Sequence, residues 1–259
     1  MPRFDRLELD SSQSRPDDDR EGRSDLIRDE QHWLRRADAE RRHGLHENAL
    51  RLYSRSLELD KSQVAGWLGQ VRMLIALDEC PEAELWARKA LELFKNQGDL
   101  LAGRAQALCR MKDRAQAIAS CDAAMQQSDQ SAYRWLVRGE VMVLTCSDVD
   151  RYCFDKAVQL DSDWLVPLEI AQVYLYHGYP SKALARARQA VEKGPEQPYA
   201  WYFQGLCERE LDFADAARRS FRRCQEIVPN HADAERNLLE LSQQGWSPVR
   251  VLRRLFRRS

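Results

Sequence analysis

Glycine and proline are scarce in this sequence, with 11 and 9 among 259 residues. A β-sandwich or β-barrel needs more turn residues than this shortage allows. Alanine, leucine, glutamate and arginine are abundant instead, and all four favour helix. The composition therefore predicts an all-α fold.

Long apolar runs and an excess of one charge are also lacking. No run approaches the ~18 apolar residues that a membrane-spanning helix needs, and the chain opens on acidic sequence without the apolar core of a secretory signal. Lysine and arginine number 40 and aspartate and glutamate 41, which leaves a net charge of −1. No specific nucleic-acid partner is expected, because such a binder needs a basic excess.

Motifs that would indicate chemistry are missing as well. None of the seven cysteines forms a C-x-x-C pair, so we expect reduced, mostly buried thiols in a cytoplasmic protein. Glycine-rich phosphate loops and G-x-S-x-G are absent. His43 and His46 flank a turn at Gly44 without a cysteine cluster nearby. We predict a protein that is not an enzyme and that has no cofactor and no metal site.

What the chain does contain is an internal repeat. Ala49, Ala83 and Ala117 are spaced by 34 residues, and so are Ala183 and Ala217. A period of this length is typical of stacked two-helix units. The predicted units cover residues 30–63, 64–97, 98–131, 132–163, 164–197 and 198–231.

Helix packing explains which residue types recur. Small residues at positions 8, 20 and 27 of most units let two helix axes approach, and large residues at positions 4 and 24 fill the space beside them. In the fourth unit Asp150 stands where a small apolar residue is expected. Position 8 is glycine at Gly139 and Gly205. One pair cannot bury its apolar face alone, so the pairs are expected to stack into an α-solenoid. The fourth unit is two residues short, and we expect one residue to be lost in each of its turns.

This pattern resembles the tetratricopeptide-repeat (TPR) family over residues 30–231. The resemblance implies a right-handed superhelix with a concave groove lined by the first helix of each pair. It also implies protein or peptide ligands and usually no catalysis. Residues at the groove positions of the family are Leu68, Arg72, Tyr133, Glu140, Leu168, Gln172, Tyr176, Tyr199, Tyr202 and Arg209. Two interpretations stay open for them: they line the groove, or they pack within their own repeat or against the C-terminal tail.

Some members of the family clamp the acidic C-terminus of cytosolic chaperones with lysine, asparagine and arginine at set groove positions. Four of those positions hold Leu34, Asp38, Asp99 and Gly103 in this chain. Chaperone clamping is therefore not expected.

The two ends differ from the repeats. Residues 1–24 are charged and polar, so we predict a disordered segment; within it, 4–9 is either a docking motif or part of a plain tail. The TPR domain is predicted over 25–244, with a capping helix at 232–244. Residues 245–259 are predicted to form a basic amphipathic tail helix. Its arginine face consists of Arg250, Arg253, Arg254, Arg257 and Arg258.

Three functions are compatible with the sequence. The first is an adaptor, scaffold or assembly factor that binds a partner peptide or helix in the groove. The second is a membrane-peripheral scaffold, in which the tail helix lies on an anionic membrane or an acidic partner. The third is a non-catalytic subunit of an enzyme complex.

The tail helix gives a testable prediction. Truncation after Gly245 should abolish any salt-sensitive binding to anionic vesicles or acidic partners, because each basic residue contributes about 1 kcal/mol at most to such binding and salt screens it. Vesicle flotation at low and high salt measures this effect. Early melting of the truncated protein, with no vesicle binding by the full chain, would show that the helix only caps the solenoid.

Overall fold

The computed structural model describes residues 29–145 and 149–243, and all regular structure in these ranges is helical. The predicted all-α repeat fold is confirmed. The predicted disordered segment 1–24, with its docking motif, and the tail helix at 245–259 lie outside the described residues. No helix in the described ranges is both long and apolar enough to cross a membrane.

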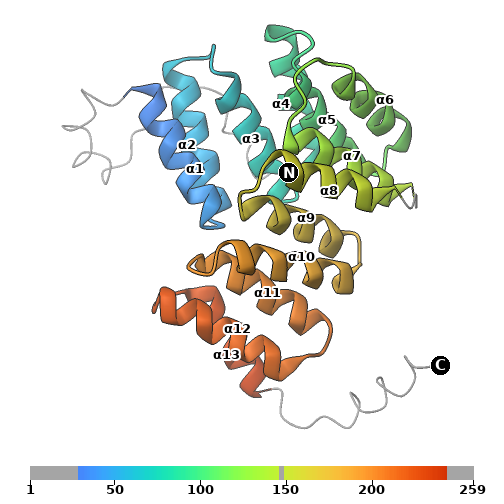
Figure 1. The fold of residues 1–259 in the computed structure, drawn as a ribbon. Coiled ribbons are helices and arrows are strands. Elements are labelled where there is room, and N and C mark those ends of the chain that lie inside the picture. The colour runs from blue at the N-terminus through green and yellow to red at the C-terminus, as the bar shows by residue number, and fades with distance from the viewer. Residues whose placement is uncertain (1–28, 146–148, 244–259) are drawn as a thin grey trace. The chain divides into compact units, whose positions relative to one another are not determined.

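Thirteen helices are formed by the described residues, and each packs on the next one or two along the chain within its unit (Figure 1). They are α1 (Glu30–Arg42), α2 (His46–Leu59), α3 (Val64–Ala76), α4 (Cys80–Leu93), α5 (Gly98–Arg110), α6 (Arg114–Met125), α7 (Ala132–Leu144), α8 (Asp150–Leu160), α9 (Leu165–Tyr176), α10 (Pro180–Lys193), α11 (Pro198–Glu210), α12 (Ala214–Ile227) and α13 (Ala232–Gln243).

The turn inside a helix pair repeats the same geometry. After α9, Gly178 has φ +78°, and the next N–H, that of Tyr179, donates to the carbonyl of Tyr174 at 2.8 Å. This is the Schellman ending of a helix, which requires one residue in the left-handed region. The equivalent residue after α5 is Lys112, with φ +63°. A single left-handed residue thus reverses the chain even where glycine is absent.

The fourth pair differs from the prediction. We expected one residue to be lost in each of its turns, but residues 161–164, which connect α8 to α9, match in length the connection at 194–197 that follows α10. The shortening falls in the helices, since α8 has 11 residues and α9 has 12. Asp150, which stands where a small apolar residue was expected, is buried at the start of α8.

The helices form two compact units, one with α1–α8 and one with α9–α13. In the first, Ala49, Tyr53 and Leu74 belong to a core of alanines and larger aliphatic residues. In the second, Phe221 of α12 is buried together with Leu241 of α13, so α13 covers the end of the last pair. That residues 25–244 form one domain stays a prediction.

Close contact between a glycine and an aromatic ring brings the helices together in two of the pairs. A side chain at Gly139 of α7 would overlap the ring of Phe154 of α8. A Cβ at Gly205 of α11 would lie 2.6 Å from a ring carbon of Phe221 of α12. The two helices can approach this closely because position 8 has no side chain.

Each of the cysteines within the described ranges is buried and free. Burial raises the pKa of the Cys80 thiol to about 11 and that of Cys207 to about 12. These groups are therefore protonated, unreactive thiols at neutral pH.

The glycine contacts predict a stability effect. Gly139→Leu and Gly205→Leu should each lower the free energy of unfolding by about 1–3 kcal/mol or more, because the added side chain forces the ring and helix axis apart. Urea unfolding followed by circular dichroism measures the loss.

Matched controls add the same bulk on an exposed helix surface. Ala119 of α6 and Ala185 of α10 are exposed. At these positions we expect substitution by leucine to change the free energy of unfolding by no more than about 0.5 kcal/mol. If the glycine variants were as stable as these controls, the assigned repeat register would be wrong.

Candidate functional site

The first helices of successive pairs lie next to one another within each unit. Helix α3 contacts α1 and α5, and α5 contacts α7; in the second unit α9 contacts α11. Within each unit, residues on the same side of these helices therefore share a surface, which is where the predicted groove residues of that unit are expected. The structure divides these residues into buried, half-buried and exposed groups.

The same contact between neighbouring first helices occurs in both units. The Tyr133 hydroxyl donates to Oε1 of Gln106 at 2.7 Å, and Nε2 of Gln172 donates to the Tyr199 hydroxyl at 2.8 Å. In each case the tyrosine follows the glutamine by 27 residues. The exposed fractions of Tyr133 and Tyr199 are only 9% and 7%. Both tyrosines thus serve mainly to join adjacent repeats.

In the first unit, Glu140 extends the contact between Tyr133 and Gln106 into a larger hydrogen-bond network. It is completely buried, and its carboxylate accepts a bond from Arg110 Nε at 3.0 Å and from Gln106 Nε2 at 2.7 Å. Arg110 also donates to the carbonyl of Ile75 at 3.0 Å. Because its side chain is completely buried, Glu140 offers no surface to a ligand.

Two predicted residues of α3 remain partly accessible. The Arg72 guanidinium lies 4.3 Å from the centre of the Tyr133 ring, a cation–π contact that holds it over the first-helix face. Leu68 is half-buried and packs against a small apolar cluster that includes Leu100. Together they leave one cation and one apolar side chain near the surface.

An aromatic stack forms on the second unit. The rings of Tyr199 and Tyr202 lie 6.4 Å apart at 20°, and Tyr202 stacks on His231 at 5.0 Å. His231 also accepts a bond from the Ala234 N–H at 3.2 Å, so it caps α13 while holding Tyr202. Burial raises the pKa of Tyr202 and keeps its hydroxyl protonated.

The remaining predicted residues of this unit differ in exposure. Arg209 of α11 hydrogen-bonds the Asn237 side chain of α13 and lies 3.4 Å from Glu240. Tyr176 is 45% exposed, whereas Leu168 is completely buried and offers no surface. His231 and Asn237 were not predicted, because their roles depend on where α13 packs.

The positions of the chaperone clamp hold other interactions here. Asp99 accepts from Arg134 Nε at 2.9 Å and from the Ser131 hydroxyl at 2.6 Å. Asp38 accepts from the Tyr53 hydroxyl at 2.6 Å. Two carboxylates thus stand where the clamp has cationic or amide groups. The predicted arginine face of the tail lies outside the described residues.

A sequence model described as Tetratricopeptide repeat matches residues 34–99 and 168–232, half of the chain. The chain belongs to the tetratricopeptide repeat family. Proteins of this family generally mediate protein or peptide binding, and their fold is typically non-catalytic. No curated protein matches the chain significantly.

Solved structures with this fold resemble the TPR protein described here. TTC0263, a thermophilic TPR protein from Thermus thermophilus, is 19% identical, with a TM-score of 0.54 over 70% of this chain and 98% of its own. A TPR protein from Parabacteroides merdae is 15% identical, with a TM-score of 0.51 over 83% of this chain and 84% of its own. At these identities the similarity concerns the fold alone.

The buried network generates a stability prediction. Glu140→Ala should lower the free energy of unfolding by about 3–5 kcal/mol, because it leaves the Arg110 guanidinium largely buried without its carboxylate. The double variant Glu140→Met with Arg110→Met should lose less than the sum of the two single changes. Thermal and urea unfolding measure both effects.

An exposed ion pair serves as the control. Arg55 lies 3.0 Å from Glu58 with both side chains about half exposed, so Glu58→Ala should cost at most about 1 kcal/mol. Equal losses for Glu140→Ala and Glu58→Ala would contradict the structural role of Glu140.

Proposed function

We propose that this TPR protein is an adaptor that holds a segment of a partner protein against the faces of its first helices. The observation that supports this most is the stack of Tyr199, Tyr202 and His231 across α11 and the start of α13. An aromatic surface fixed from both sides loses little conformational entropy when a ligand binds it.

Polar groups beside the stack add specificity. Gln172 borders Tyr199 through its hydrogen bond, and Arg209 lies against Asn237 and Glu240. Arginine has five donors in all, and half-buried arginines and tyrosines are enriched among residues that contribute most to binding. Tyr176 adds an exposed ring at the end of α9. This combination fits an extended peptide or a helix with apolar anchors.

The first unit offers a second, more basic surface of the same kind. Arg72 is held over Tyr133, and Leu68 lies one turn earlier on α3. A cation beside an apolar side chain fits a partner segment in which an apolar residue lies next to an acidic one. We propose that this surface and the stack both contact partner segments.

Cytoplasmic location is part of the proposal. The free, buried cysteines of the described residues support a reducing compartment, where disulfides do not form. The membrane-peripheral alternative depends on the tail helix, outside the described residues, and the enzyme-subunit alternative depends on an unknown partner. Both remain alternatives to the adaptor.

Site-specific cross-linking tests the proposal. A photoreactive amino acid placed at Leu68, Tyr176 or Tyr202 should capture one and the same partner in cells of the source organism. Placed at Tyr152, which is 55% exposed on α8, it should capture none or different proteins. Mass spectrometry identifies the captured peptide, which is then synthesised.

Affinity for that peptide gives the quantitative test. Tyr202→Ala and Arg209→Ala should each weaken binding by about 2 kcal/mol, the size expected at a binding hot spot, while far-ultraviolet circular dichroism stays unchanged. Capture of the partner only at Tyr152, or normal affinity of both variants for the peptide, would show that the binding site does not lie on the first helices.

A further inference from the structure

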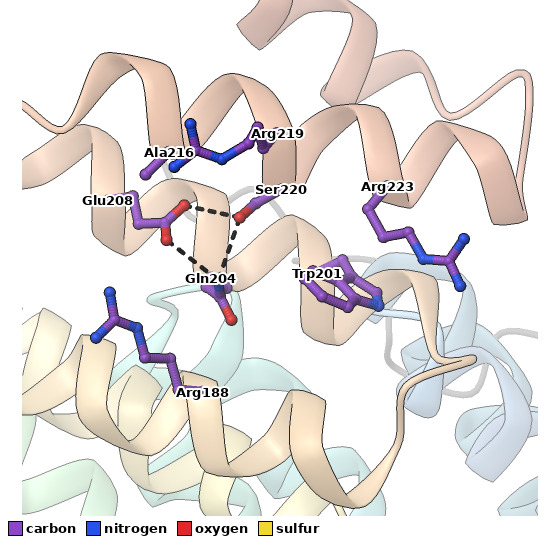
Figure 2. A pocket seen from close by; sticks show the side chains of 8 residues that line it. All are labelled: Arg188, Trp201, Gln204, Glu208, Ala216, Arg219, Ser220 and Arg223. Atoms are coloured by element: carbon purple, nitrogen blue, oxygen red, sulfur yellow. Dashed lines mark hydrogen bonds between the residues drawn. The ribbon is translucent and has the colours of Figure 1, made fainter.

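A separate pocket lies in the second unit between α10, α11 and α12 (Figure 2). It has a volume of about 380 Å³ and is lined by Arg188, Trp201, Gln204, Glu208, Ala216, Arg219, Ser220 and Arg223. Pockets of this size are large enough to hold one or two side chains of a ligand. None of these residues belongs to the proposed partner-binding surface.

The pocket opens on a different face of α11 from the one that carries Tyr202. One face of α11 carries Trp201, Gln204 and Glu208, which are spaced by three and four residues. Another face of the same helix carries Tyr202 and Arg209. At about 100° per residue these two faces point in different directions. The pocket therefore belongs to the side on which the second helices lie.

Three buried polar side chains form the floor of the pocket. Nε2 of Gln204 donates to Glu208 at 3.1 Å and to the Ser220 hydroxyl at 3.2 Å, and that hydroxyl donates to the other Glu208 oxygen at 2.7 Å (Figure 2). All three are nearly inaccessible to solvent. Both carboxylate oxygens of Glu208 are thus held by neutral donors, which gives the floor a fixed shape.

Two arginines stand over this floor without a partner. Within the described residues, neither Arg188 of α10 nor Arg219 of α12 forms an ion pair or hydrogen bond, and both are exposed. Figure 2 shows their guanidinium groups on either side of Glu208, with that of Arg219 beside Ala216. Two cations against one carboxylate leave a net positive charge at this end.

The other end of the pocket is different in character. Arg223 lies 2.9 Å from Glu226 and 3.7 Å from Glu196, so its charge is already offset. The Trp201 ring lines this end and is anchored by its Nε1, which donates to the carbonyl of Pro195 at 2.8 Å. An apolar surface thus lies beside the cationic end.

We propose that this pocket binds an acidic side chain of a peptide, with its oxyanion between Arg188 and Arg219 and a neighbouring apolar residue against Trp201. Arginine binds planar oxyanions through paired, charge-assisted hydrogen bonds, and both carboxylate and phosphate fit this geometry. The TPR protein then has two binding faces on one unit.

Fluorescence anisotropy of the full chain with labelled octapeptides tests the proposal. Three probes share one sequence with a central residue flanked by leucines; that residue is glutamate, phosphoserine or glutamine. We expect both anionic peptides to bind at low salt and the glutamine peptide to bind at least about tenfold more weakly, because the charge-assisted hydrogen bonds are lost. Comparing the two anionic peptides distinguishes carboxylate from phosphate.

Three pocket variants locate the site. Arg188→Gln and Arg219→Gln should each weaken binding by about tenfold. Ala216→Met should weaken it by filling the space beside Arg219, and thermal melting checks that the variant is folded. The matched control is Arg222→Gln, because Arg222 is exposed on α12, does not line the pocket and has no ion pair within the described residues. It should change affinity by less than about twofold, as expected for a screened charge.

Several outcomes would overturn the proposal. One is no binding of either anionic peptide at about 1 mM, near the weak limit of specific recognition. Another is an equal loss in Arg222→Gln and Arg219→Gln, which would indicate a diffuse basic surface. Displacement of the peptide by inorganic phosphate at equal affinity would show that the pocket takes a free anion. These measurements use synthetic octapeptides and not the captured partner peptide, so failure here is separable from failure of the adaptor proposal.

Discussion

The contact between a small residue and an aromatic ring is the constraint on which the rest of the structure depends. Gly139 against Phe154 and Gly205 against Phe221 set how closely the two helices of a pair approach. Tyr53 of α2 makes the same kind of contact with Gly69 of α3, which joins one pair to the next. With both spacings fixed, the polar groups of the first helices come within hydrogen-bonding distance.

Polar side chains then link the repeats. The tyrosine–glutamine contact recurs in both units, at Tyr133 with Gln106 and at Tyr199 with Gln172. In the first unit Glu140 completes a network that gives its buried carboxylate hydrogen-bond donors, as buried polar groups require. Such contacts need a defined distance between helices, so they favour one packing of adjacent repeats over others. These contacts fix the geometry of the binding surface and add little contact area to it.

The second unit combines two surfaces of different chemistry. The stack that ends at His231 is aromatic, and it lies on the side of the first helices. The pocket over Glu208 is cationic and lies between α10, α11 and α12. A repeat protein can carry both because successive helices of one pair present different faces. A partner with an aromatic or apolar anchor and a partner with an acidic side chain would therefore not compete for the same residues.

The sequence by itself determined the helical class, the repeat family and the small residues of the core. Those features are periodic and local: alanines spaced by 34 residues mark the pairs, and position 8 is alanine or glycine in five of the six predicted units. Only the tertiary structure decided which groove residues are accessible. Glu140 and Tyr176 both occupy predicted groove positions, yet one is completely buried and the other is 45% exposed. Glu140 is buried together with partners such as Arg110, 30 residues away in the chain, and no local pattern encodes that contact. The pocket was missed for the same reason, because Arg188 and Arg219 line one pocket only when α10, α11 and α12 pack together.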